Sequence, residues 1–521
     1  MYTASNRDQL SIEEFFIPFG GKLLKSNRWV KLAELMPWDQ IEKIYMESFS
    51  DENGRPALSA RIAFGAIFIK ENDNLTDAGT VAAIQENPYM QYFLGLSGFQ
   101  VEPLFDPSMM VHFRKRFPVE SIAKINEYVC TGVWPEAQRQ VDRNDIEKEE
   151  KSEKDNNDED DQSPPMSPET DEKGKTNRKK AKKKVKQQKK NRGKLIMDAT
   201  VAPADIKYPT DIDLLNKSRE HLENAINILW EKVPHTGHKL PYSAKKARKS
   251  YLSLSKSKKW TTAKCRAAIG DQLRCIALAA SRLEELQKQV AEYATLFPGW
   301  LKRRLEVIPQ VYQQQKQMYE NRTHQCEDRI VSLAQSHVRP ISRGKRPEPT
   351  EFGQKLHLSV VDGFTYLEQT SWDNFNEGCD LQATVTDYFR KFRYYPKAVL
   401  ADKIYQTRAN RAFCKKHGIR LSGPALGRKR NDDNRKEKRQ MLRDTRERNA
   451  IEGRNGNAKR RFGLDLIFAK LDETAKTEAA LNLVAMNAAY KLRRILLRFF
   501  AFFQFFSGQA GKIRAFSVSP S

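Results

Sequence analysis

The sequence predicts an α/β core with a mixed sheet flanked by helices, joined to two all-helical regions. Residues 350–423 alternate between apolar runs typical of strands and segments with helical spacing, and one more apolar run stands at 195–199. Residues 211–338, between these strands, have apolar residues at helical spacing almost throughout. Residues 1–134 share that helical period. We therefore expect a large all-helical insert in the core and an all-helical N-terminal domain.

The N-terminal region contains two strong helical segments and one basic segment. RIAFGAIFIKEN (61–72) and TDAGTVAAIQENPYMQYFLGL (76–96) predict two helices. DPSMMVHFRKRF (106–117) predicts a short amphipathic helix. Three cations are expected on its polar side: Arg114, Lys115 and Arg116. This basic face could lie against DNA, although a solvated helix face explains it as well.

A change of charge separates the N-terminal region from the core. Residues 141–172 contain fourteen Asp or Glu against four Lys or Arg, whereas residues 173–194 contain thirteen Lys or Arg and no acid. With almost nothing apolar to bury, residues 135–193 are expected to be a disordered charged linker. The acidic half could compete with DNA for the basic half, or the segment could be a plain tether.

Long helices are predicted in the insert, over 213–233, 268–297 and 307–337. The first two are separated by a cationic stretch, KKARKSYLSLSKSKKWTTAK (245–264), that contains Trp260. Basic residues interleaved with aromatic ones suit contact with phosphates and stacking on bases, so Trp260 is a candidate DNA contact. A solvated connection is the alternative interpretation.

The strands of the core follow the insert. FGQKLHLSVV (352–361) and GFTYLEQTSW (363–372) meet at Asp362-Gly363, a strong signal for a hairpin. The next segments predict helix, strand, helix and strand in turn: CDLQATVTDYFRKF, YYPKAVLAD, TRANRAFCKKHG and GIRLSG. A long basic stretch, residues 428–461, comes last.

Two of these strands end on a carboxylate. LIMDAT places Asp198 after three apolar residues, and AVLAD places Asp402 after four. A carboxylate at the end of a buried strand is costly unless it pairs with a cation, accepts hydrogen bonds or binds a metal. Taken singly, each fits a helix cap or a salt bridge better than a metal ligand. Three further acids rival Asp198: Asp205, Asp211 and Asp213, of which Asp211 is expected to cap the following helix.

A third carboxylate stands among cations in ERNAIEGRNGNAKRR (447–461). Residues 448, 452 and 459 are four and seven apart, so Arg448, Glu452 and Lys459 share one face of a helix. This arrangement suits chemistry at a phosphodiester, in which the carboxylate holds a metal and the cations hold phosphate oxygens. Gly453 and Gly456 each cost about 1 kcal/mol of helix stability relative to alanine, and we expect them to permit close approach of DNA.

Composition indicates the class of partner. The chain of 521 residues has a formal charge of +25, which favours a polyanion such as DNA, with an anionic membrane as the competing partner. The apolar run FFAFFQFF (499–506) is far shorter than the ~20 residues of a spanning helix. No export signal is seen, and the six cysteines form no CxxC pair, so we expect a cytoplasmic protein without a membrane partner.

Several long segments together resemble one family, the bacterial insertion-sequence DDE transposases of the insertion-sequence-5 type, related to the insertion-sequence-4 catalytic domain families. The matching segments are NPYMQYFLGL, MDATVAPADIKYPTDIDLLNKSRE, EFGQKLHLSV, WDNFNEG, AVLADKIYQTRANRAF and RNAIEGRNGNAKRRFGLDLI. In related families a tyrosine, an arginine, a glutamate and a lysine follow one another at fixed spacing around the third acid. Arg448, Glu452 and Lys459 keep this spacing, whereas Thr445 occupies the position of the tyrosine.

The resemblance implies a ribonuclease-H-like core with the catalytic and metal-binding triad Asp198, Asp402 and Glu452. It implies two Mg²⁺ ions, for which Mn²⁺ would substitute, and cleavage of DNA followed by transfer of a 3′-hydroxyl into target DNA. The implied partners are double-stranded DNA, which supplies both the transposon terminal inverted repeats and the target, and a second copy of the chain in a homodimer. The implied location is the bacterial cytoplasm, in association with the nucleoid. A nuclease without strand transfer and an inactive DNA-binding remnant are the alternatives. The candidate DNA contacts are Arg448, Lys459, Arg454, Asn455, Arg460, Arg461, Arg114, Lys115, Arg116 and Trp260.

The expected organisation has five parts. They are an N-terminal helical domain for binding transposon ends (1–134), the charged linker (135–193, acidic over 141–172 and basic over 173–194), the catalytic core (194–210 and 350–475), the helical insert (211–340), and a C-terminal helix and tail (476–521).

Overall fold

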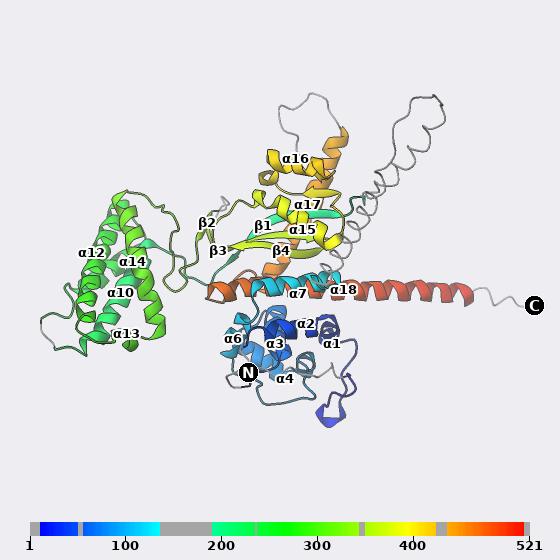
Figure 1. Cartoon of the computed structure of the whole chain (residues 1–521), viewed down its shortest axis with the longest axis horizontal. Coiled ribbons are helices and arrows are strands. Elements are labelled where there is room, and N and C mark those ends of the chain that lie inside the picture. The colour runs from blue at the N-terminus through cyan, green and yellow to red at the C-terminus, as the bar shows by residue number, and fades with distance from the viewer. Residues whose placement is uncertain are drawn as a thin grey trace, which may run out of the picture.

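The structure is a computed structural model that describes residues 11–49, 56–135, 190–234, 237–342, 350–423 and 435–514. Most of the predicted charged linker, residues 136–189, lies outside these ranges. Figure 1 shows a central sheet, a long helix, α18, running along one side of it, the N-terminal helices beyond α18, and a separate group of helices formed by the segment between β1 and β2.

The sheet is mixed, as the sequence predicts. Its strands are β1 (Lys194–Pro203), β2 (Pro340–Ser342), β3 (Thr350–Val361), β4 (Phe364–Ser371), β5 (Ala398–Leu400) and β6 (Arg420–Leu421). They lie in the order β4-β3-β1-β5-β6, and β2 pairs with the start of β3. The β1–β3 and β3–β4 pairs are antiparallel, whereas β1–β5 and β5–β6 are parallel.

The hairpin predicted at Asp362-Gly363 is confirmed. Asp362 and Gly363 both have positive φ, at 50° and 83°, and Val361 pairs with Phe364 across the turn. Two successive residues with positive φ give the turn a twist that matches the strands on either side.

Strand β1 is longer than predicted, and this changes the setting of Asp198. The expected strand, 195–199, ended just after Asp198, but β1 continues to Pro203 because its last residues pair with β3 as far as Gly353. Asp198 therefore lies in the middle of a strand and not at its end. The apolar run LIM gave no sign of this continuation, which depends on a partner strand 150 residues later in the chain.

Helices cover both faces of the sheet. On one face α15 (Leu381–Phe392) and α16 (Arg408–Lys416) pack on Leu195 and Met197 of β1. On the other face, α17 (Arg435–Phe462) and α18 (Asp472–Arg514) belong to the core that contains Ile196 and Leu358. Alternation along β1 thus directs successive side chains to different helical layers.

Within its described residues, 11–49 and 56–135, the N-terminal region forms seven α-helices. They are α1 (Arg28–Leu35), α2 (Trp38–Met46), α3 (Ala60–Asp73), α4 (Asp77–Glu86), α5 (Pro88–Phe93), α6 (Met109–Lys115) and α7 (Val119–Thr131). The helix expected over 76–96 is in fact two. The break falls at Asn87, whose side chain accepts hydrogen bonds from the N–H groups of Tyr89 and Met90, and Pro88 then starts the next helix.

These N-terminal helices do not have a core of their own. Phe64, Phe68 and Phe117 belong to the same hydrophobic cluster as Leu356 of the sheet and Val484 of α18. Helices α3, α6 and α7 pack directly along α18.

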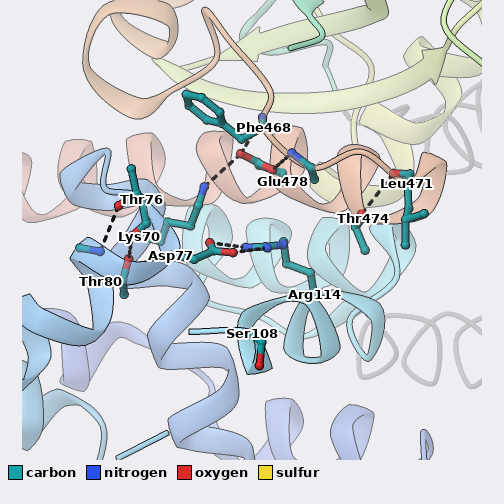
Figure 2. A network of polar contacts seen from close by, with 12 residues as sticks. Lys70, Thr76, Asp77, Thr80, Ser108, Arg114, Phe468, Leu471, Thr474 and Glu478 are labelled. Atoms are coloured by element: carbon teal, nitrogen blue, oxygen red, sulfur yellow. Dashed lines mark hydrogen bonds and ion pairs between the residues drawn. The ribbon is translucent and has the colours of Figure 1, made fainter. Parts of the chain in front are cut away.

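A buried polar network crosses the same contact (Figure 2). Lys70 of α3 donates to Glu478 of α18 at 3.0 Å and to Glu71 at 2.7 Å. Glu478 also accepts hydrogen bonds from the backbone N–H groups of Phe468 and Ala469. Burial raises the pKa of Glu71 to about 7. The N-terminal helices are therefore tied to the sheet region by charge pairs as well as by apolar contact.

The segment between β1 and β2 is helical and has a separate core. Its helices are α10 (Asp211–Trp230), α11 (Ala244–Ser255), α12 (Thr262–Gln287), α13 (Tyr293–Leu296) and α14 (Gly299–Glu320). Their buried residues include Leu229, Ile276, Leu301 and Val311, and the cluster contains no residue of the sheet.

Two of the predicted insert helices are too long. The helix expected over 268–297 ends at Gln287, and the one expected over 307–337 ends at Glu320. Arg322, just beyond the end of α14, has a left-handed φ of 53°, which stops a helix, and Glu292, with a φ of 52°, precedes the separate short helix α13. Ile330 and Leu333, beyond the end of α14, are still buried. The sequence therefore keeps its apolar spacing after the backbone has ceased to be helical.

The C-terminal apolar run FFAFFQFF (499–506) falls within the helix α18, but its side chains lie outside what the structure describes. Among the helices that are described, none combines the length and the apolar character that crossing a bilayer demands.

Candidate active site

Asp198 and Asp402 come from neighbouring parallel strands. Ile196 of β1 pairs with Leu400 of β5, and each carboxylate follows its strand residue by two positions. The two aspartates therefore follow the last paired residues of adjacent parallel strands, and the charge of Asp402 acts on the Asp198 carboxyl. Asp402 lies just beyond β5, where it begins the short 3-10 helix η3 (Lys403–Tyr405).

Helix α17 brings the third carboxylate to the same place. It packs against both β1 and β5, with Ile451 and Ala458 fully buried. Glu452 follows Ile451 and is exposed. One turn earlier, the Nη1 atom of Arg448 lies 3.2 Å from a carboxylate oxygen of Asp402.

The charges at this place act on one another. Burial raises the pKa of the Asp198 carboxyl above its usual range. The negative charges of Asp402 and Glu452 raise it further, whereas the guanidinium of Arg448 lowers it. The structure thus pairs Arg448 with Asp402 directly, and Asp402, Glu452 and Arg448 lie near enough to Asp198 for their charges to act on its carboxyl.

The donor set has the chemistry that Mg²⁺ prefers, since carboxylate oxygens are its usual protein ligands and repulsion between carboxylates favours an added cation. The side chains as they stand do not close around an ion: in the described part of the chain, no three His, Cys, Asp or Glu side chains form a group able to hold a metal. Arg448, paired with Asp402, is the cation now at this place.

Two of the three acids that rivalled Asp198, Asp211 and Asp213, have other side-chain partners. Asp211 accepts hydrogen bonds from Gln315 and Arg329 within the insert, and Asp213 accepts from Lys207. The prediction that Asp211 caps α10 is wrong. Thr210 fills that role, because its hydroxyl oxygen accepts the N–H of Asp213.

The other candidate DNA contacts on α17 fall into two groups. Arg460 and Arg461 are exposed, and Lys459 is half-buried. Arg454 is engaged within the chain, because its guanidinium lies 3.8 Å from the centre of the Tyr490 ring and donates to the carbonyl of Gly363. Burial lowers its pKa. Asn455 is half-buried, and its buried Oδ1 atom accepts no hydrogen bond from the described residues.

The prediction that three cations lie on an exposed face of α6 is wrong for one of them. Arg114 is only 5% exposed and forms a two-pronged ion pair with Asp77, at 2.9 and 2.7 Å (Figure 2). The helix is covered by α3 and α18, so a buried cation at this position needs an acid as its partner. Arg116 is half-buried over the Phe49 ring, whereas Lys115 is exposed.

Trp260 lies on the surface of the insert, with 46% of its area exposed. The stretch around it is not a simple connection, because its first half forms helix α11. Residues 244–264 contain no acid. Their cations, all exposed, are Lys245, Lys246, Arg248, Lys249, Lys256, Lys258, Lys259 and Lys264. We call these eight residues the α11 cationic surface.

Sequence reasoning missed the buried polar side chains that hold the loop of Asp402. Asn410 and Ser422 bond to backbone groups on either side of this aspartate, and both are buried. Asn410 lies inside the segment AVLADKIYQTRANRAF, but neither periodicity nor charge distinguishes it from a surface asparagine.

Comparison with known families matches two parts of this chain. A family model described as "Transposase DDE domain" matches residues 399–488, which include Asp402 and Glu452. A second, described as "Transposase domain (DUF772)", matches residues 19–116 of the N-terminal helices.

A curated relative is also similar. It is described as "Uncharacterized protein ORF8 in nfe locus" of Rhizobium meliloti and is 33% identical over 96 residues. The match covers 18% of this chain and 46% of the relative, so less than half of that protein is spanned. No solved structure matches. Both matching families are described as transposase families, in agreement with the resemblance inferred from the sequence.

Proposed function

We propose that this protein is the transposase of a bacterial insertion sequence, which cuts DNA at the terminal inverted repeats and joins the freed 3′-hydroxyl to target DNA. The observation that carries the proposal is the ion pair of Arg448 with Asp402, next to Asp198, whose carboxyl also experiences the charges of Asp402 and Glu452. Three carboxylates and a guanidinium form a set of side chains suited to phosphoryl transfer. An exposed ion pair would stabilise the fold by under about 1 kcal/mol, which would not explain why so many charges are grouped here.

The sheet supports a ribonuclease-H-like core as part of this proposal. Three antiparallel strands, β1, β3 and β4, are followed along the chain by β5 and β6, which lie parallel to β1. The proposed catalytic aspartates stand on β1 and after β5, at the centre of the sheet. Helices α10 to α14 would then be an insert between the first strand of the core and the rest.

Asp198, Asp402 and Glu452 would hold two Mg²⁺ ions, with Mn²⁺ as a substitute. When bound, such ions supply an activated water or 3′-hydroxyl and neutralise charge on the leaving oxygen. The chain's own part is to hold the carboxylates in place and to bind phosphate. Arg448 is suited to a phosphate oxygen, since a guanidinium offers paired N–H donors.

The surface charge supports duplex DNA as the partner. Arg460 and Arg461 extend the site along α17, and a Cβ added at Gly453 would meet nothing within 4 Å, so packing inside the chain does not require glycine there. The α11 cationic surface provides a second place for phosphates, beside Trp260. The N-terminal helices would recognise the transposon ends, and a homodimer would pair two ends.

The test is cleavage of the DNA that flanks the protein's own gene, in Mg²⁺ or Mn²⁺, with the cut ends mapped. Asp198→Asn, Asp402→Asn and Glu452→Gln should abolish cleavage while sparing DNA binding. Glu447→Gln is the matched control, because Glu447 lies on the same helix and pairs with Lys194 at the surface. Cleavage retained by any of the three variants would remove that residue from the site.

Pre-cut ends supplied with a target duplex separate the proposed function from its alternatives. Joined product is expected of a transposase. Cleavage without joining would indicate a nuclease, and binding without either reaction would indicate an inactive remnant.

A further inference from the structure

The backbone that carries Asp402 is neither strand nor long helix. β5 ends at Leu400, and η3 starts directly after Asp402. A side chain at such a reversal is placed only as well as the surrounding loop is held, because no ladder of backbone hydrogen bonds fixes it.

One side of the loop is held from β6. The N–H of Ala401 donates to the Oγ atom of Ser422 at 3.0 Å, and the same hydroxyl donates to the carbonyl of Ala401 at 3.2 Å. The N–H of Ser422 donates to the carbonyl of Val399 at 2.8 Å. Ser422 is only 6% exposed, so water does not compete for these groups. Together they replace the strand pairing that stops just before Asp402.

The other side is held from α16. The Nδ2 atom of Asn410 donates to the carbonyl of Tyr405 at 2.9 Å and to that of Gly378 at 2.7 Å. Asn410 is 2% exposed. A Cβ added to Gly378 would lie 2.4 Å from the carbonyl oxygen of Ile404, so the two backbones are in direct contact.

This second loop is in turn fixed to the sheet. Gly378 belongs to η2 (Glu377–Cys379). Lys355 of β3 donates to the carboxylate of Glu377 at 2.5 Å and to the carbonyl of Phe375 at 2.6 Å. Strand β3 pairs with β1, which carries Asp198. A continuous path of contacts therefore relates the loop of Asp402 to the strand of Asp198.

We propose that Asn410 and Ser422 are positioning residues, which hold the loop of Asp402 at a fixed distance from Asp198. The inference rests on the proposed function for the role of Asp402, but the hold on the loop is a property of the fold. Metal sites tolerate small displacements of their ligands poorly, and loss of the groups behind the ligands typically weakens metal affinity about 10- to 100-fold.

The experiment uses the full chain with Asn410→Asp, Ser422→Ala and Ser422→Thr. The first keeps the shape of the side chain and removes its N–H donors, and the third retains the hydroxyl. Asn487→Asp is the matched control, because Asn487 is fully buried and donates in the same way, to Thr365 at 2.6 Å and Asn126 at 2.9 Å, far from the loop.

Two measurements are made on each variant. Hydrogen exchange of the amides of residues 401–406 reports how firmly the loop is held. The Mn²⁺ concentration for half-maximal binding, followed by electron paramagnetic resonance in the presence of DNA, reports the placement of the carboxylate.

Asn410→Asp and Ser422→Ala should speed exchange in this segment and raise the Mn²⁺ midpoint about tenfold, while Ser422→Thr stays near wild type and Asn487→Asp changes neither. Exchange that is unaltered, or altered equally by Asn487→Asp, would overturn the proposal. So would faster exchange with an unchanged Mn²⁺ midpoint in a protein that binds the ion. If wild-type protein binds no Mn²⁺, the proposed function fails, and the exchange of residues 401–406 still decides whether the two residues hold the loop.

Discussion

The N-terminal helices and the helices between β1 and β2 are both regions of helix attached to one sheet, but they are stabilised in different ways. The first group shares its apolar core with the sheet and with α18. The second encloses a core of its own, with no sheet residue in it.

Buried polar contacts sharpen the contrast. Asn126 and Lys70 of the N-terminal helices bond across to Asn487 and Glu478 of α18. In the insert, the largest buried cation, Arg219, bonds to Gln272 and Asn216 of the same region. The two regions thus differ in which part of the chain supplies the hydrogen-bond partners of their buried polar side chains. We expect the N-terminal helices to unfold with the sheet, and the insert to unfold separately.

The strongest test removes a charge between the N-terminal helices and α18. Lys70→Ala leaves Glu71 and Glu478 buried without their shared cation, which should cost about 3–5 kcal/mol. The loss should appear in hydrogen exchange of both the α3 and the β3 amides, and not in that of α10. Lys207→Ala is the control, since this exposed lysine pairs with Asp213 at the surface and should cost under about 1 kcal/mol. Destabilisation confined to α3 would show that the N-terminal helices unfold alone.

A second test uses pH and the buried His357 of β3. Burial lowers the pKa of this imidazole to about 4, although the negative charge of Glu377 raises it. The Nδ1 atom of His357 lies 3.4 Å from a carboxylate oxygen of Asp380. The unfolded chain therefore binds a proton that the folded chain does not between about pH 6.5 and pH 4, so stability falls as the pH falls through this window.

The expected loss is about 3 kcal/mol, at 1.36 kcal/mol for each unit of pKa. His357→Gln should remove this part of the pH dependence, measured by denaturant unfolding at pH 7 and pH 4. Probes in the sheet and in the N-terminal helices should follow the same curve. An acid-dependent loss sensed equally by the insert would contradict separate unfolding.

The smallest effect belongs to the insert. Ile276→Val trims a side chain that is 1% exposed in the separate core, and should cost about 0.5–1.5 kcal/mol. Exchange should quicken in α10 and α12 but stay unchanged in β1 and α18. Faster exchange in β1 would mean that the insert and the sheet form one cooperative unit.

Local features of the fold were open to prediction from the sequence. Asp362-Gly363 specified a hairpin because both positions need positive φ, and the spacing of Arg448 and Glu452 specified one face of a helix. Apolar runs gave the strands and most of the helices, since burial of one face imposes a period. The ends of helices were less accessible, as α14 shows, because buried residues continue beyond its last turn.

The sequence by itself thus predicted most of the strands and helices and singled out the four residues of the candidate site. Only the tertiary structure decided which helices share a core with the sheet, that Arg114 faces Asp77, and that Asn410 and Ser422 hold the loop of Asp402. The reason is physical. Period and turn chemistry act between near neighbours along the chain, whereas the partner of a buried polar group comes from wherever the fold brings another segment, here from 37 residues away for Arg114 and 21 for Ser422.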